Sequence, residues 1–173
     1  MTQTAPPPPR MTIADILRLG RAGRPWEFLS LGAMALQEVP DSEALRFVFA
    51  ANLARLGLGE LAREQLALLP AASRGHTDVV ALDGAAAALP PALMPRTERL
   101  ENARRAANAL RGRGVELGAE FERWTAAQDG VEVFRTVDGN VIRRPAGETN
   151  ARRWQGLFVG RGFAGQVRDR ALE

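Results

Sequence analysis

The stretch 41–70 carries the clearest hydrophobic pattern in the chain, and it predicts two short amphipathic helices joined by a glycine-containing link, 57–59. The first helix begins where Asp41 or Ser42 can accept a hydrogen bond from the opening turn. Its large apolar residues share one helical stripe: Leu45, Val48, Phe49, Leu53 and Leu56. The second helix ends before Pro70 and carries Leu61, Ala62, Leu66, Leu68 and Leu69. Neither helix can bury its apolar face alone, so the pair requires neighbouring helices.

Two further helices are predicted before this unit. Thr12 and Asp15 have the spacing of a capping box, which begins a helix carrying Ile13, Ile16, Leu17 and Leu19. Gly20 and Gly23 are expected to loosen the chain after it. Proline suits the first turn of a helix, so a second helix is expected from 25 to about 38, with apolar residues Trp26, Leu29, Met34 and Leu36.

An internal echo connects these helices with the central unit. Segment 29–36 aligns with 61–68 at an offset of 32 residues, and three of the eight aligned residues are identical. A proline follows each of the two helices, at Pro40 and Pro70. This repetition indicates a pair of stacked helical hairpins.

The central unit resembles a tetratricopeptide repeat (TPR), a helical hairpin of about 34 residues. The resemblance covers about 30 residues and rests on Arg46-x2-Phe49-Ala50-x2-Leu53, then Ala62-x3-Leu66, then Pro70. Arg46 replaces the family's tryptophan, Ala50 replaces its glycine, and the proline comes about one turn early. The resemblance implies a solenoid that binds a protein or peptide partner on the inner face of its first helix. The implied partner-binding residues are Phe47, Ala51, Ala54 and Arg55.

The second half of the sequence predicts three more helices, after which the apolar pattern changes from helical to strand periodicity. Thr77 or Asp78 can cap a helix reaching Leu89, and a longer polar helix, 96–112, carries the narrow stripe Leu100, Ala103, Ala107 and Leu110. A last helix before Gly130 is marked by Leu117, Phe121 and Trp124. Val131–Val137 and Val141–Arg144 then flank Asp138-Gly139-Asn140, which predicts a β-hairpin. Because a lone hairpin is marginal in water, it must lie on the helices or join further strands.

The predicted fold is therefore mainly α-helical: a TPR-like solenoid, a small β-hairpin and a basic C-terminal tail. Residues 1–10 are expected to be a disordered proline-rich tail, with Pro6–Pro9 in a polyproline II segment. The helical domain is expected over 11–130. Residues 131–173 would form the hairpin and a Gly/Arg-rich segment, which could begin a further domain.

Composition excludes several kinds of chemistry. The chain has 173 residues, no cysteine and one histidine, His76, which excludes disulfides, thiolate sites and multi-histidine metal sites. All 23 basic residues are arginine and the net charge is only +3, so the high isoelectric point reflects missing lysine and tyrosine more than excess charge. Missing lysine with abundant Ala, Arg, Gly and Pro suggests a GC-rich bacterial source. The sequence implies no cofactor or metal, contains no membrane span or signal layout, and favours a cytoplasmic protein.

Gly160, Gly162 and Gly165 form a G-x-G-x-x-G pattern, in which glycines can bring the backbone close to a pyrophosphate at a helix N-terminus. A dinucleotide fold also needs a complete βαβ unit, and only eight residues follow Gly165. The alternative to a protein-interaction or scaffolding module is thus an N-terminal accessory region of a larger, transferase-type nucleotide-dependent enzyme whose catalytic domain lies beyond residue 173. The alternative interpretation of these three glycines is a flexible glycine loop in an arginine-rich tail, with no nucleotide-binding role.

The C-terminal arginines suggest a third hypothesis. Residues 143–173 hold seven arginines and three acids, interleaved with Trp154, Phe158 and Phe163. Arginine beside aromatic side chains can contact nucleic-acid phosphates and bases. A solvated surface segment is the competing interpretation.

Overall fold

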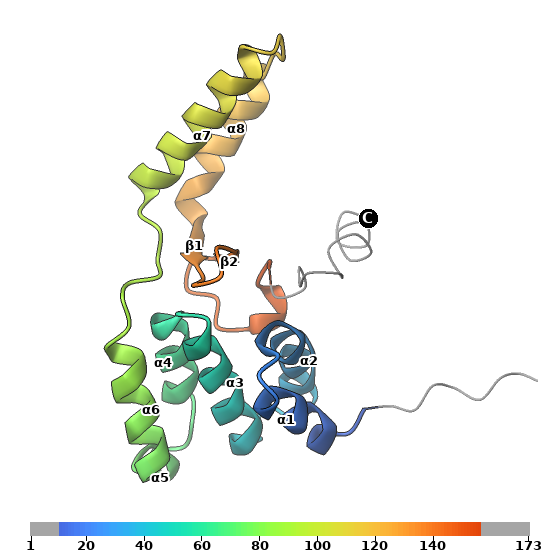
Figure 1. The fold of residues 1–173 in the computed structure, drawn as a ribbon, viewed down its shortest axis with the longest axis vertical. Helices are drawn as coiled ribbons and strands as arrows, with labels where there is room; N and C mark the ends of the chain where they lie inside the picture. Colours follow the sequence, from blue (N-terminus) through green and yellow to red (C-terminus); the bar gives the residue numbers. More distant parts are fainter. Residues whose placement is uncertain (1–10, 157–173) are drawn as a thin grey trace, which may run out of the picture.

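The computed structural model describes residues 11–156, which form a mainly helical protein with one two-stranded antiparallel sheet (Figure 1). The α-helices are α1 (Ile13–Arg21), α2 (Pro25–Glu38), α3 (Glu43–Arg55), α4 (Gly59–Ala67), α5 (Ala71–Arg74), α6 (Thr77–Ala87), α7 (Arg96–Arg111) and α8 (Gly118–Ala127). The strands are β1 (Val131–Arg135) and β2 (Val141–Pro145), and two 3-10 turns are η1 (Gln128–Gly130) and η2 (Ala151–Arg153). The predicted helices and hairpin are therefore confirmed, and the predicted features of 1–10 and 157–173 lie outside the described residues.

Local capping explains several helix boundaries. The Thr12 hydroxyl accepts from the Asp15 backbone N–H, and the Asp15 carboxylate accepts in return from the Thr12 N–H, which completes the predicted capping box. Ser42 caps α3. The cap predicted at Thr77 or Asp78 is wrong, because α6 begins after His76 without a side-chain cap. The short helix α5 was not predicted from sequence.

Helices α1 to α6 form the helical body, which has one hydrophobic core. Phe28 of α2 and Phe49 of α3 are completely buried at its centre, with their ring centroids 6.2 Å apart. Met34 and Leu68, which the sequence pattern placed among the apolar stripes, are 47% and 49% exposed. The sequence pattern did not single out Phe28. Neighbouring helices therefore decide which apolar side chains of a broad stripe enter the core.

Gly20 is also placed differently from its prediction. It lies inside α1 rather than in a loosened link, and a Cβ atom built there would come within 2.7 Å of the Phe28 and Val48 side chains. The missing side chain thus permits α1 to approach α2 and α3 closely.

The two strands pair in a register that sets Glu132 opposite Arg144 and Phe134 opposite Ile142. Both edges of this hairpin are partnered. Backbone hydrogen bonds connect Met94 and Ala92 to β1, and Gln155 exchanges two with Arg143 of β2. The expectation that the hairpin needs support is confirmed, since flanking segments and helices both supply it.

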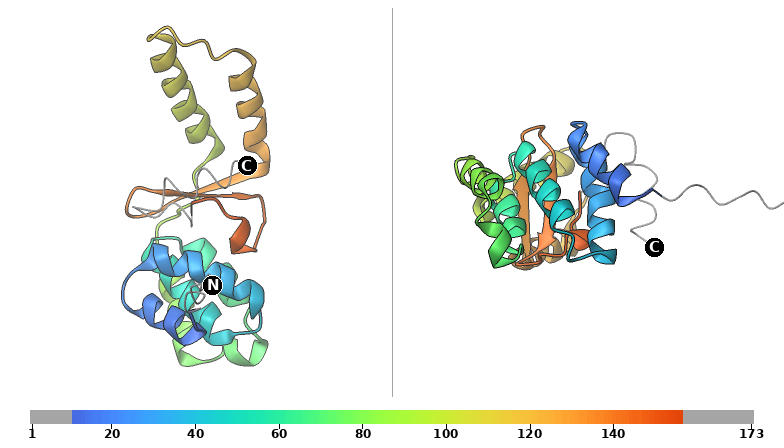
Figure 2. Two further views of the ribbon diagram at one scale, coloured as in Figure 1. Left: turned by 90° about the vertical axis from the view of Figure 1, so that its right-hand side faces the viewer. Right: turned by 90° about the horizontal axis from the view of Figure 1, so that it is seen from below.

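One face of the hairpin lies on the helical body. Because side chains alternate along a strand, Glu132, Phe134, Ile142 and Arg144 share that face. Phe134 and Ile142 join the core of the body, as does Trp154, whose ring centroid lies 6.5 Å from that of Phe49. Figure 2 shows the sheet as a layer between the helical body and the paired helices α7 and α8.

Arg144 joins the sheet to the body through a cluster of charges around its buried guanidinium. Its side chain is 3% exposed, and its guanidinium donates to both carboxylate oxygens of Glu64 on α4, at 2.5 and 2.7 Å. It also donates to Glu132 at 2.8 Å and to the Glu148 carbonyl at 3.2 Å. The guanidinium carbon lies 5.1 Å from the Phe134 ring centroid and 5.6 Å from that of Trp154.

These contacts shift the ionisation of the cluster. Burial lowers the pKa of Arg144, but the hydrogen bonds and charges of Glu64 and Glu132 outweigh it, so the pKa is raised overall. Burial likewise raises the pKa of Glu132, whereas the Gly147 N–H and Arg144 lower it more. Both groups therefore stay charged at neutral pH.

The hairpin turn is held against the body by a second set of contacts. The Trp26 indole N–H donates to the Asp138 carboxylate at 2.6 Å, and the Val137 N–H donates to the Leu56 carbonyl at 2.9 Å. Gly57 has φ +80°, and a Cβ atom there would lie 2.5 Å from the Val137 side chain. A residue with a side chain at 57 would thus be strained and would push the turn away.

Replacement of Arg144 by methionine should lower the free energy of unfolding by about 3 kcal/mol, because Glu64 and Glu132 would remain partly buried without their cation. We take the lower end of the usual range because these carboxylates are 35% and 30% exposed. Urea unfolding followed by circular dichroism measures the change. Arg143→Met is the matched control, since Arg143 is exposed and on the opposite face; it should change stability by less than about 0.5 kcal/mol. Equal losses in both variants would contradict the role of Arg144.

The docking of the turn should be sensitive to acid. Burial raises the pKa of Asp138, but hydrogen bonds from Thr136, Trp26 and Asn140 lower it below its ordinary value of 3.8. A carboxylate with a lowered pKa in the folded state stabilises above its unfolded pKa and loses that contribution as pH falls through the folded value. Trp26→Phe should therefore cost more stability near pH 7 than near pH 2. An equal cost at both pH values, measured by urea unfolding, would contradict this assignment.

Candidate functional site

The sheet leaves one side of the helical body uncovered. Polar contacts to the hairpin region come from α2 and α4: Trp26, Gln37, Glu64 and Gln65 bond to residues between 138 and 150. In the view from below, helices of the body lie in front of the strands (Figure 2). The candidate binding face of α3 includes Phe47, and it lies outside these contacts.

A groove lies beside Phe47, between α3 and the segment that connects α4 to α6. Its apolar floor includes Phe47, Leu69 and Val79. Leu69 and Val79 are buried, at 4% and 9% exposure, and Phe47 is half-buried against the core. The full lining is Glu43, Ala44, Phe47, Leu69, Ser73, His76, Asp78 and Val79.

The rim of this groove is acidic. Glu43 lies in the first turn of α3, where its carboxylate accepts a hydrogen bond from the Ser73 hydroxyl, and Asp78 lies in the first turn of α6. The exposed His76 precedes α6. Carboxylates at helix N-termini are favoured by the helix dipole. The groove thus combines an apolar floor with two carboxylates, and within residues 11–156 no arginine lines it.

The four residues implied by the TPR resemblance share one stripe of α3 but differ in their surroundings. Phe47 lines the groove, and Ala51 and Ala54 are half-buried. The Arg55 guanidinium donates to the Gly20 carbonyl at 2.9 Å. The buried Asn52 amide donates to the same carbonyl at 3.3 Å. Arg55 therefore ties α3 to the end of α1, a contact that periodicity could not reveal because it joins residues 35 positions apart.

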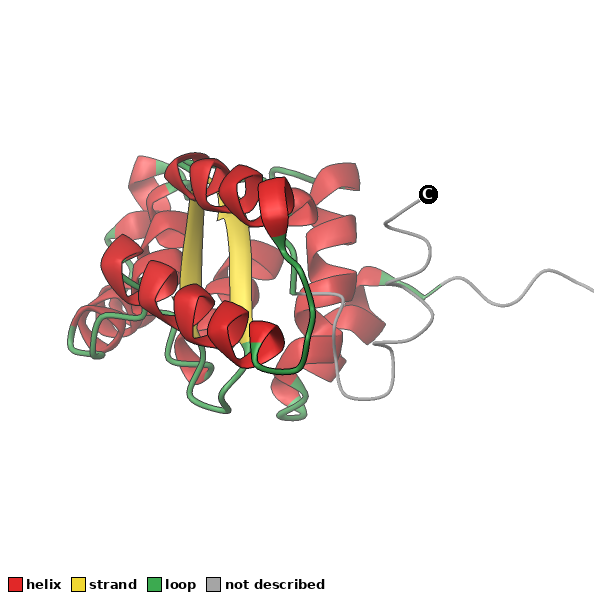
Figure 3. Ribbon diagram, turned by 90° about the horizontal axis from the view of Figure 1, so that it is seen from above, coloured by secondary structure: helices red, strands yellow, loops and turns green. Residues whose placement is uncertain are grey.

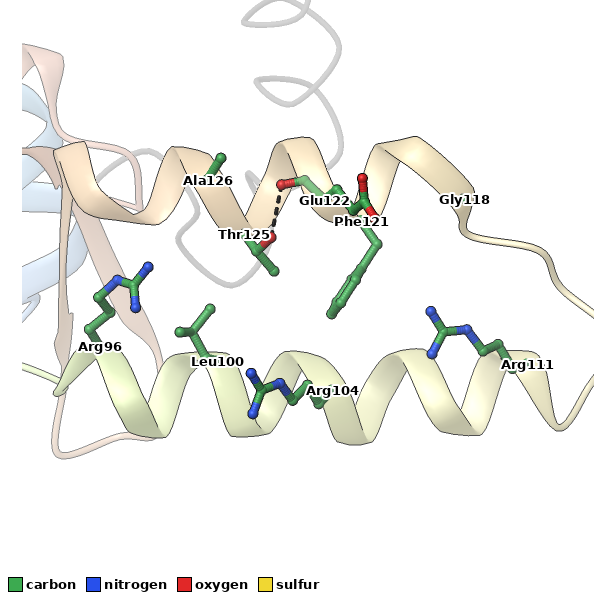
Figure 4. Close-up of a pocket in the computed structure, with 9 residues that line it drawn as sticks. All are labelled: Arg96, Leu100, Arg104, Arg111, Gly118, Phe121, Glu122, Thr125 and Ala126. Carbon is green, nitrogen blue, oxygen red and sulfur yellow. Dashed lines mark hydrogen bonds between the residues drawn. The ribbon is translucent and has the colours of Figure 1, made fainter.

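Helices α7 and α8 enclose a second feature, a slot between their facing sides (Figure 4). Leu100 and Phe121 extend into it from opposite helices, with Arg104 and Arg111 alongside. The Arg111 guanidinium carbon lies 5.8 Å from the Phe121 ring centroid. The sequence stripes marked both helices but did not predict an open space between them.

The structure tests the other sequence hypotheses only in part. Gly160, Gly162 and Gly165 lie outside the described residues, so the nucleotide-loop hypothesis and the accessory-region alternative stay predictions. Arg144 and Trp154 lie within the arginine-rich segment 143–173 of the nucleic-acid hypothesis, and they are 3% and 1% exposed. These two side chains are therefore buried and not accessible to phosphates or bases, and the hypothesis for 157–173 stays a prediction.

Within residues 11–156, no helix is both long and apolar enough to cross a membrane. Comparisons with protein-family models, with curated proteins and with solved structures gave no match. The candidate sites therefore rest on the geometry of this chain.

Arg55→Ala should lower the free energy of unfolding by about 1 kcal/mol, because it removes a charged hydrogen bond from the α1 terminus while Asn52 still satisfies the Gly20 carbonyl. Thermal and urea unfolding measure the loss. Arg74→Ala is a suitable control, since that arginine is exposed in α5. If the Arg55 variant keeps its stability, the hydrogen bond from Arg55 to the Gly20 carbonyl does not stabilise the fold, which would contradict this prediction.

Proposed function

We propose that this chain is a TPR-like protein-interaction module that binds a peptide segment of a protein partner in the Phe47 groove. The order of helix packing supports the TPR-like description. Helix α1 packs on α2, α2 on α3, α3 on α4 and α4 on α6, while α1 also contacts α3 and α3 contacts α6. Successive helical pairs that contact only their neighbours are the arrangement of a solenoid.

The internal echo is consistent with this proposal. Leu29 and Leu61, which align at the 32-residue offset, are both fully buried on α2 and α4. The aligned residues Ala33 and Gln65 are both buried as well, whereas Leu36 is buried and its aligned partner Leu68 is 49% exposed. The two buried pairs support a solenoid in which α2 and α4 are the second helices of successive hairpins and α1 and α3 are the first helices.

The observation that carries the proposal is the partly open Phe47 groove on the side that the sheet does not cover. A half-buried aromatic ring in a pocket is a typical anchor for a partner side chain. The Glu43 and Asp78 carboxylates on the rim favour a basic side chain beside that anchor. The proposed ligand is therefore a peptide in which an apolar residue stands close to an arginine or lysine.

The test uses short fluorescent peptides that combine one leucine or phenylalanine with arginine, and matched peptides in which glutamate replaces arginine. Fluorescence anisotropy should show binding of the basic set only. Phe47→Ala should weaken that binding about ten-fold, which corresponds to about 1.4 kcal/mol. Met34→Ala is the matched control, because Met34 is an exposed apolar residue on α2.

Two outcomes would contradict the proposal: basic and acidic peptides that bind equally, or affinity that the Phe47 variant retains. Because Phe47 also contacts the core, circular dichroism must show that Phe47→Ala keeps its helicity. If helicity is lost, Asp78→Asn provides the test, since Asp78 is exposed on the rim and its removal should weaken binding of the basic peptides alone.

A further inference from the structure

Helices α7 and α8, with the loop that joins them, form an arm (residues 96–127) that projects from the rest of the protein (Figure 1). Its base is fixed near the sheet. Glu98 accepts from Arg135 of β1 at 2.5 Å, Arg96 pairs with Asp129, and Arg99 donates to the Gln128 side chain at 2.9 Å. The remainder of the arm extends beyond these contacts, so its direction is set at the first turns of α7.

The arm buries little of its own apolar surface. Among the side chains described in α7 and α8, only that of Ala107 is buried. Leu100 and Phe121 are half-buried beside the slot, and Leu110 is 38% exposed. A narrow stripe with the spacing of Leu100, Ala103, Ala107 and Leu110 is typical of helices that pack in a coiled-coil seam. Seen from above, the two helices stand apart with the strands visible between them (Figure 3).

Charge is divided unequally between the two sides of the arm. Helix α7 holds five arginines and two glutamates, a net charge of +3. Residues 116–127 hold three glutamates and one arginine, a net charge of −2. A second copy of the arm is therefore complementary to the first when each basic helix lies beside the other copy's acidic helix. A two-fold axis produces this arrangement because it applies both contacts at once.

We infer that the arm is a dimerisation element, in which the α7–α8 pairs of two copies form a four-helix bundle. In this bundle α7 of each copy lies beside α8 of its partner, and Leu100 and Phe121 enter the shared core. The inference is independent of the peptide groove, which lies on the helical body. Nucleic acid is the other ligand for a basic helix, but Arg96 and Arg99 are engaged at the base and the acidic α8 lies alongside.

Sedimentation velocity of the full chain, from about 1 to about 100 μM, tests the inference, because a dimer of this kind dissociates on dilution. Leu100→Asp should raise the dimer dissociation constant by about ten-fold or more, because it places a charge in the shared apolar core. Val80→Asp is the matched control: it places the same charge at a 57% exposed valine on α6, away from the arm, and should leave the constant unchanged. Circular dichroism and urea unfolding of the helical body verify that both variants are folded.

A charge-reversal experiment separates contact between copies from contact within one arm. Arg104→Glu places like charges across the proposed interface, and so does Glu122→Arg. Each variant alone should therefore dimerise about ten-fold more weakly. An equal mixture should recover the dimer, because the reversed α7 of one variant meets the reversed α8 of the other. Pairing within a single arm cannot be restored by mixing.

Three results would overturn the inference: a wild-type chain that stays monomeric at about 100 μM, a dimer that survives Leu100→Asp, or a mixture that does not recover. A labelled oligonucleotide is included as a further probe. A monomeric protein whose oligonucleotide affinity falls on Arg104→Glu and with added salt would assign the arm to nucleic acid instead.

Discussion

The buried guanidinium of Arg144 is the interaction on which the rest of the structure depends. A cation that is 3% exposed is stable only when its donors are satisfied, and its partners come from three separate places: Glu64 on α4, Glu132 on β1 and the carbonyl of Glu148 after β2. The helical body, the hairpin and the returning chain must all be in place before the charge is compensated. Phe134 and Trp154 lie against the guanidinium and complete the junction. The junction thus fixes one orientation of the sheet on the helices.

That orientation determines which surfaces stay open. The sheet covers the side of the body formed by α2 and α4, so the Phe47 side of α3 remains accessible beside α5 and α6. The same sheet supports the arm on the other side, where Arg135 of β1 holds Glu98 of α7. Two separate surfaces result, an acidic groove on the body and a slot in the arm. A dimer formed through the arm would carry two grooves, and a partner with two suitable peptide segments would then bind with the advantage of avidity.

Much of the helical architecture could be predicted because its signals are local. The Thr12 cap, the proline that begins α2 and the glycine turn of the hairpin act over a few residues, so each element can be located from neighbouring sequence. The 32-residue echo aligned Leu29 with Leu61, which are both fully buried, but it also aligned the buried Leu36 with the exposed Leu68. Of the candidate site, the TPR resemblance supplied Phe47 but not the acidic rim. Glu43 and Asp78 meet there only because α6 packs beside α3.

The sequence by itself thus determined the order of the helices other than α5, the hairpin and the apolar stripes. Tertiary structure alone decided which members of a stripe are buried: Phe28 became the centre of the core, while Leu68 and Met34 remained exposed. Tertiary structure also decided that Arg144 and Trp154 are buried, where they connect the sheet to the helical body. The physical reason is that burial, and the pairing of a buried charge, depend on groups contributed by distant segments. Periodicity records only which side of an element is apolar, and the neighbours that cover that side are set by packing.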